Sequence, residues 1–276
     1  MFLERRSKQA LTGGAVRPWH VVFIVVVAWL VSEVAAAKIA TGWDAANRSN
    51  AFFTAADVIN ALILPAFILI VPEFRRTLPV LFSRPLESPR ATDLAWALLT
   101  MITWGYGLYR IAFLYPVLYF RPDLFELFAL SEAPSKFGWA FIGVAFTAIL
   151  FAPIAEELMY RGFLLNLWIP RHGLWVGIIA SSVVFGVLHW ERTLFATVMG
   201  VALALIYLRY DSLWPGIVIH GVYNFLCFNW SLGAIVGVKD RATVADPMNW
   251  IVEIILTALF LPAAWQFWRR FRPRPS

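Results

Sequence analysis

Residues 137–163 of the chain read FGWAFIGVAFTAILFAPIAEELMYRGF. The first part, 137–152, is uncharged, and Glu156, Glu157 and Arg161 then follow within two helical turns. A long apolar run indicates a membrane helix, in which each unpaired central charge costs about 2.5–3.5 kcal/mol. The stretch therefore predicts a membrane-embedded helix in which the three charged side chains have partners that offset this cost.

Composition places the whole chain in the same class. Of its 276 residues, 61% are hydrophobic, 16% are aromatic and only 14% are charged. Apolar runs of about 20 residues, long enough to cross a bilayer as helices, recur along the sequence. We expect about eight spans, at about 19–37, 52–72, 94–120, 137–168, 174–190, 194–209, 213–232 and 248–267.

The predicted fold is therefore an all-α, polytopic integral membrane helix bundle. We expect residues 1–136 to form N-terminal transmembrane helices with a basic tail. Residues 137–232 should form the helical core that carries the chemistry, and residues 233–276 the final span with a second basic tail. The first span is too long for a cleavable signal peptide and is followed by further spans.

The net charge of +6 arises mainly from basic residues at the termini and helix ends. They form no extended patch with interleaved aromatic residues, so we do not expect nucleic-acid binding. With eight spans, most of them would lie on the side that holds both termini. The positive-inside rule then predicts that both termini are cytoplasmic.

The three charges of the opening stretch divide into a pair and a remainder. Glu157 and Arg161 stand four residues apart with the acid first, the favourable order for an ion pair within a helix. Glu156 is turned by about 100° from Glu157 and needs a partner on another helix. A solvated helix end at the membrane interface would also account for charges here.

Two further motifs supply candidate partners. FGVLH ends at His189, and a turn at residues 170–173 would bring His189 to the same depth as Glu156. In HGVYN, His220 and Asn224 share one helix face, which suits polar groups that face the protein interior. Both motifs also fit structural hydrogen bonding. The single cysteine, Cys227, lies on that face, where a small buried hydrophobe is commoner than a nucleophile.

These groups fit acyl hydrolysis by water. A carboxylate or imidazole titrating near neutrality accepts a proton from the attacking water, and imidazole and amide groups donate to the oxyanion.

The three motifs also resemble those of a known protein family. EELMYR, FGVLH and HGVYN are similar, in order, to the EExxxR, FxxxH and HxxxN motifs of the CPBP family. This family contains CAAX proteases, Abi proteins and type II CAAX prenyl endopeptidases, and the resemblance covers roughly residues 137–230.

The resemblance implies a role for each motif residue. Glu156 would be the general base, with His189 helping to position the water. His220 and Asn224 would form the oxyanion hole, with Glu157, Arg161 and Phe185 as supporting residues. The resemblance leaves metal dependence open: Glu156, His189 and His220 are three candidate zinc ligands, but the soluble HExxH pattern is missing. The implied substrate is a membrane-embedded or lipidated peptide, and oligomeric state is not indicated.

The number of residues between His189 and His220 argues against a site that contains both histidines, and two other functions are also consistent with the sequence. If a full span separates His189 from His220, His220 lies only about 10 Å below the surface, shallower than His189. A kinked, tilted or shortened helix is then needed. The alternatives are a non-catalytic immunity or scaffold protein of the same family and a proton-coupled transporter, although no internal repeat supports the latter.

Overall fold

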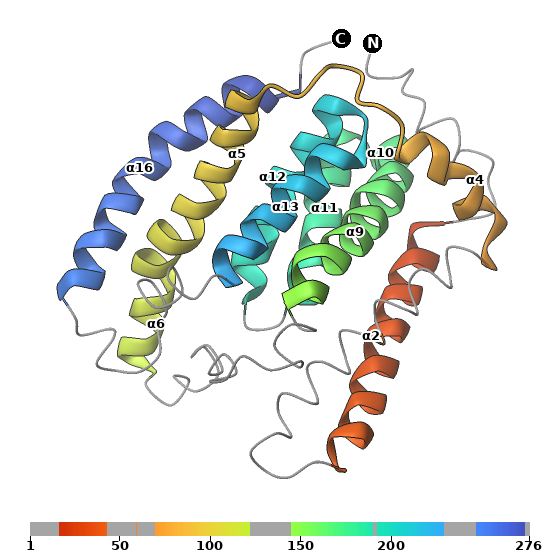
Figure 1. The fold of residues 1–276 in the computed structure, drawn as a ribbon, viewed down its shortest axis with the longest axis horizontal. Helices are drawn as coiled ribbons and strands as arrows, with labels where there is room; N and C mark the ends of the chain where they lie inside the picture. The colour runs from red at the N-terminus through yellow and green to blue at the C-terminus, as the bar shows by residue number, and fades with distance from the viewer. Residues whose placement is uncertain are drawn as a thin grey trace.

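The computed structural model describes residues 17–42, 59, 70–121, 145–189, 192–228 and 247–273. In these residues the regular elements are helices and there is no strand, which confirms the all-α prediction (Figure 1). They are α2 (Pro18–Ala40), α4 (Pro72–Leu81), α5 (Ala91–Thr103), η1 (Trp104–Leu108), η2 (Arg110–Leu114), α6 (Tyr115–Phe120), η4 (Thr147–Phe151), α9 (Ala152–Glu156), η5 (Glu157–Leu165), α10 (Asn166–His172), α11 (Leu174–Val187), α12 (Thr193–Tyr210), α13 (Leu213–Phe228) and α16 (Pro247–Phe271).

Four helices in the described part of the chain are long and apolar enough to cross a membrane. They are Trp19–Ile39, Ala91–Phe120, Thr193–Tyr210 and Pro247–Phe271. Each coincides with a predicted span. The apolar helix α11 has 14 residues and falls short of that length. The predicted span at 52–72 and the start of the span at 137–168 lie mostly outside the described residues, so the total of eight stays a prediction.

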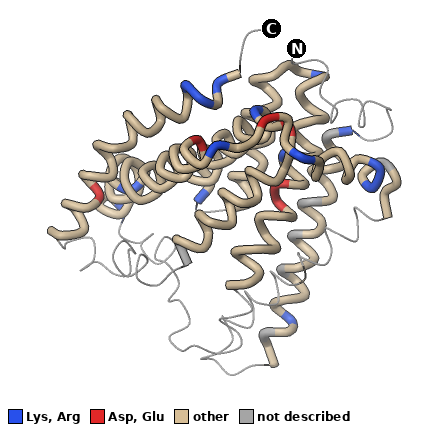
Figure 2. Tube along the Cα trace, turned by 45° about the horizontal axis from the view of Figure 1, so that its top comes forward, with Lys and Arg blue, Asp and Glu red and all other residues tan. Residues whose placement is uncertain are grey.

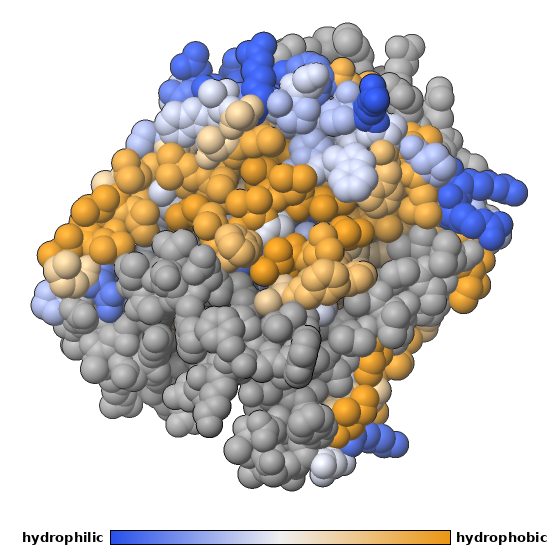
Figure 3. All heavy atoms as spheres, in the orientation of Figure 1, coloured by the Kyte–Doolittle hydropathy of each residue, from blue (hydrophilic) through white to orange (hydrophobic). Residues whose placement is uncertain are grey.

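The surface of the protein is divided into an apolar middle and a hydrophilic end. Figure 3 shows apolar residues covering the middle of the visible face, with hydrophilic residues gathered along its upper fringe. At this end of the bundle α2 begins and α10 and α16 end (Figure 1). Many of the basic residues in Figure 2 also gather there. We call it the basic end; among its residues are Arg17, Arg171, Arg209, Arg269 and Arg270.

Small residues allow α11 and α12 to pack closely at the centre of the bundle. A Cβ added to Gly200 of α12 would lie 2.9 Å from the Cβ of Ser182. One added to Gly186 of α11 would lie 2.0 Å from Oγ1 of Thr197. Helix pairs in membranes are commonly held by such close backbone contact, because burial against lipid supplies little driving force. This pair forms one wall of the central bundle.

A buried ion pair joins the first half of the chain to the last helix. Arg110 Nη1 lies 3.0 Å from Oε1 of Glu253, and the Glu253 side chain is completely buried. Tyr115 donates its hydroxyl to the same oxygen at 2.5 Å. Glu253 is not among the residues predicted from the sequence, although a lone acid in the last span and a lone Arg110 in an earlier one point to such a pairing.

The Arg110–Glu253 pair should contribute to stability because either charge alone would be buried without a partner. We expect Glu253→Gln to lower the free energy of unfolding by about 3–5 kcal/mol. The double change Arg110→Met with Glu253→Leu should recover at least half of this loss. Thermal unfolding of the purified protein in detergent measures both effects.

A matched control exists on the same two helices. Arg270 Nε and Asp93 Oδ1 are 3.0 Å apart, but these side chains are 30% and 17% exposed. Asp93→Asn should therefore change stability by less than about 1 kcal/mol. Equal effects of Glu253→Gln and Asp93→Asn would show that burial does not set the strength of these pairs.

Candidate active site

The helix that carries EELMYR is interrupted by π-helical turns. It runs through η4, α9, η5 and α10, and Pro153 lies in the short α-helical segment between two π-helical stretches. Proline has no backbone N–H, so carbonyl groups one turn earlier lose their usual donor. Such π-helical turns are frequent at functional sites.

Helix α13 packs against this interruption. Asn224 Nδ2 donates to the carbonyl oxygen of Ala148 at 2.8 Å, which is the carbonyl five residues before Pro153. A Cβ added to Gly221 would lie 2.8 Å from the carbonyl oxygen of Ile149, four residues before the proline. A backbone N–H at position 153 would donate to residue 149 in an α-helix or to residue 148 in a π-helix, and both of these carbonyls face α13.

Glu157 and Arg161 form a buried ion pair, as their spacing predicts. Arg161 Nη1 lies 2.9 Å from Glu157 Oε1, with the side chains 2% and 0% exposed. Arg161 Nη2 also donates to the carbonyl oxygen of Gly200 on α12 at 3.2 Å. Its guanidinium carbon lies 4.6 Å from the ring centre of Phe185. Arg161 therefore has three kinds of partner: the Glu157 carboxylate, a backbone carbonyl oxygen and the face of an aromatic ring.

Glu157 has a second partner that sequence reasoning missed. Its Oε1 lies 3.1 Å from Nδ1 of His220, and a carboxylate can only accept, so Nδ1 is the donor. Gly216, one helical turn before His220, provides the space, because a Cβ there would lie 3.0 Å from Glu157 Oε2. The pattern of a glycine four residues before a histidine on α13 could have indicated this approach.

Glu156 lies on the other side of the same imidazole. Its Oε2 is 3.6 Å from Nε2 of His220, and its side chain is 24% exposed whereas that of Glu157 is 0% exposed. His220 thus stands between two carboxylates, one fully buried and one partly exposed. The unpaired acid of the opening stretch has its partner on another helix, as the helical rotation required.

The structure removes the objection about the depth of His220. Helix α13 begins at Leu213, which packs against Gly162: its Cδ1 would lie 3.5 Å from a Cβ there. The start of α13 therefore lies beside residue 162, ten residues before the end of α10. His220 is about 10 Å beyond Leu213 and Glu156 about 9 Å before Gly162, so they meet.

The position of the α12–α13 turn has local causes. Asp211 ends α12 in the left-handed conformation, with φ 47°, a conformation that Asp tolerates better than most residues. Ser212 Oγ donates to the carbonyl oxygen of Ser83 at 2.8 Å, and Trp214 Nε1 donates to that of Phe82 at 3.0 Å. The segment after α4 thus fixes where α13 starts, and so the depth of His220.

His189 reaches the group through Phe185. Its Nδ1 lies 2.7 Å from the carbonyl oxygen of Phe185, which can only accept, so Nδ1 carries the proton. The Phe185 ring centre lies 4.4 Å from that of His189 and 6.1 Å from that of His220. Phe185 is therefore a neighbour of both imidazoles and packs on Arg161 as well. Tyr160 packs edge-on against the Phe185 ring, with ring centres 5.0 Å apart.

The sequence also offers three candidate zinc ligands and one candidate cysteine nucleophile. Within the described residues, no three His, Cys, Asp or Glu side chains are grouped so that they could hold a metal ion. Glu156, His189 and His220 thus do not form a three-ligand zinc site in this structure. Cys227 lies on α13, but its side chain is outside what is described.

Comparison with known proteins supports the resemblance that the motifs suggested. Residues 138–226 match the family model described as type II CAAX prenyl endopeptidase Rce1-like. Neither the curated proteins nor the solved structures include a match to the chain. The matched segment begins before η4 and ends in α13, so it contains all three motifs. Residues 138–226 are therefore similar to the Rce1-like family of type II CAAX prenyl endopeptidases.

Proposed function

We propose that the protein is an intramembrane endopeptidase in which Glu156 activates water to hydrolyse a peptide bond of a membrane-associated substrate. The observation that carries the proposal is the placement of His220 between two unlike carboxylates, 3.1 Å from Glu157 and 3.6 Å from Glu156. The family description makes peptides with a prenylated C-terminal CAAX sequence the first substrates to test.

In the proposed step Glu156 accepts a proton as a water oxygen attacks the scissile carbonyl. The partial exposure of Glu156 supports this role, because a general base must reach the water whose proton it takes. The carbonyl oxygen becomes an oxyanion, the tetrahedral intermediate then collapses, and the proton passes to the departing amine. Two peptide products form, and Glu156 returns to its carboxylate form.

His220 and Asn224 are proposed as the donors to the oxyanion. Glu157 fixes the imidazole by its contact to Nδ1, so Nε2 faces the reacting groups and donates when it carries a proton. Asn224 has two N–H donors, of which one binds Ala148. His189, with Nδ1 tied to Phe185, is proposed to position the water through Nε2.

The basic end is proposed to face the cytoplasm, as the positive-inside rule favours. The end of α10 and the last turns of α12 and α16 would then lie at that interface, with Arg171, Arg209, Arg269 and Arg270. Substrates would approach Glu156 from within the bilayer or from its cytoplasmic surface.

The role of Glu156 can be tested in purified protein reconstituted into vesicles. We expect Glu156→Gln and His189→Ala each to lower kcat at least about 100-fold, the usual contribution of a general base or its partner. Thermal stability should change little, because both side chains are only partly buried. Two probes are compared: a fluorescent farnesylated CAAX peptide and an unprenylated single-span peptide.

The outcomes separate the role of Glu156 from the choice of substrate. Cleavage of either probe by wild type and not by Glu156→Gln supports the mechanism, and the cleaved probe defines the substrate class. Activity of Glu156→Gln near that of wild type would overturn the mechanism. If neither probe is cleaved, crosslinking in native membranes with Glu156→Gln and mass spectrometry identifies retained peptides, and none above the wild-type level would contradict a protease.

Glu157 is proposed to position His220 and should respond differently from Glu156. Glu157→Gln removes the charge that pairs with Arg161 and orients Nδ1 of His220, so both stability and kcat should fall. At a temperature where the variant is fully folded, kcat should remain at least about tenfold low, with KM within threefold of wild type. Recovery of full kcat under those conditions would show that Glu157 has only a structural role.

A further inference from the structure

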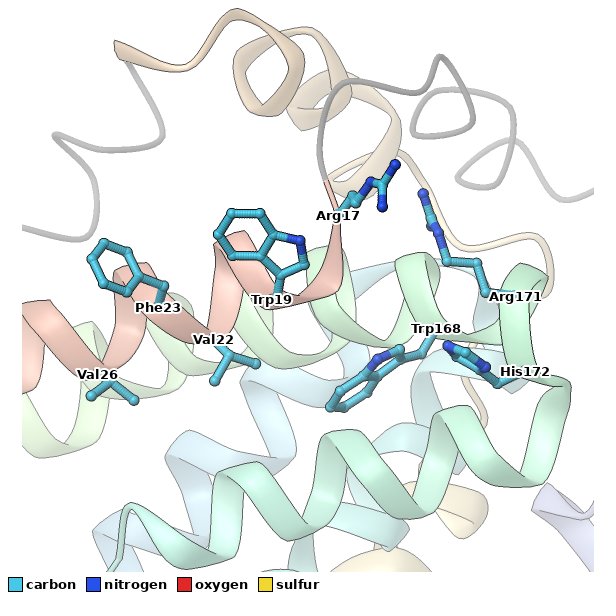
Figure 4. A pocket seen from close by; sticks show the side chains of 8 residues that line it. All are labelled: Arg17, Trp19, Val22, Phe23, Val26, Trp168, Arg171 and His172. Atoms are coloured by element: carbon cyan, nitrogen blue, oxygen red, sulfur yellow. The ribbon is translucent and has the colours of Figure 1, made fainter.

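A groove at the basic end lies apart from the candidate active site. It has a volume of about 830 Å³ and is formed by the first turns of α2 and the end of α10 (Figure 4). Sites for small organic ligands are typically about 300–1,000 Å³. None of the residues described as lining the groove belongs to the three motifs, and none is acidic.

The outer part of the groove is cationic. Arg17, just before α2, and Arg171, near the end of α10, both line it, and His172 lies beside Arg171. Figure 4 shows the two arginine side chains, one from just before α2 and one from α10, extending into the same region. The Arg171 side chain is braced by a hydrogen bond from Nη1 to the carbonyl oxygen of Leu167 at 2.7 Å. Guanidinium groups donate several hydrogen bonds, and phosphate oxygens are acceptors that suit them.

The inner part of the groove is apolar and belongs to the membrane-spanning part of α2. Trp19, Phe23 and Val26 recur at helical spacing and so share one face. Trp19 and Phe23 are 59% and 63% exposed. Trp168 of α10 forms the opposite wall. Tryptophan with arginine at a membrane interface suits the boundary between lipid headgroups and chains.

We infer that this groove binds one anionic phospholipid of the surrounding bilayer. Its phosphate would lie between Arg17 and Arg171, and one acyl chain would lie along the Trp19–Phe23–Val26 face against Trp168. Basic pockets between transmembrane helices are established sites for anionic headgroups. The apolar face excludes a free phosphate as the preferred occupant, because such an ion would leave the aromatic side chains uncovered. The site is independent of the chemistry proposed for Glu156.

Native mass spectrometry of the purified full-length protein tests the inference. In detergent with added phosphatidylglycerol, wild type should retain one lipid at concentrations at which phosphatidylcholine is not retained. Arg17→Gln combined with Arg171→Gln should weaken this binding at least about tenfold, since each arginine near an anionic headgroup contributes favourably. The matched control is Arg75→Gln with Arg76→Gln, two exposed arginines of α4 outside the groove, which should bind as wild type does.

Two more arms test the two halves of the ligand. Phe23→Ser should weaken retention while the charges remain, and excess inorganic phosphate should not displace the lipid. Equal retention of phosphatidylcholine and phosphatidylglycerol by wild type would overturn the inference. So would unchanged binding in the groove double variant, or displacement by inorganic phosphate. If the double variant unfolds, Arg17→Gln alone decides, because Arg17 precedes α2 and is exposed.

Discussion

The buried ion pair between Glu157 and Arg161 is the constraint on which the centre of this protein depends. Neither charge is stable alone in a membrane interior, so each must be satisfied from several directions. Arg161 reaches Glu157, the carbonyl oxygen of Gly200 and the face of Phe185. Glu157 in turn holds His220. One pair thereby ties η5 to α12 and also to α11 and α13, which carry the other two motifs.

A second ion pair in the same molecule shows what distinguishes the candidate active site. Arg110 and Glu253 also form a buried pair, and Tyr115 adds a hydroxyl. Both pairs leave one carboxylate oxygen buried without a hydrogen bond, Oε2 of Glu157 and Oε2 of Glu253. Only the first has a further, partly exposed acid across an imidazole. A buried ion pair alone is therefore consistent with a purely structural contact between helices. The additional carboxylate of Glu156 is the feature that is consistent with hydrolysis.

The amino-acid sequence predicts which residues of this site pair with one another better than it predicts the depth of each residue in the membrane. The spacing of Glu157 and Arg161 favours their pairing, and the helical rotation of Glu156 favours a partner on another helix. The depth of His220 could not be obtained by counting residues, because the count contained no information on which residues lie beside the start of α13. Contacts of Ser212 and Trp214 with the segment after α4 help to fix that start. These contacts join residues about 130 positions apart, and no local pattern reports them.

A double-mutant cycle on Glu157 and Arg161 tests the central claim most directly. Unfolding free energies are measured for wild type, Glu157→Gln, Arg161→Met and the double variant in one detergent. If the pair is the buried constraint described here, the double variant should be more stable than the sum of the single changes predicts, by at least about 1 kcal/mol. A coupling near zero would mean that Glu157 and Arg161 are satisfied independently, and the account of why Glu156 is left as the reactive acid would fail.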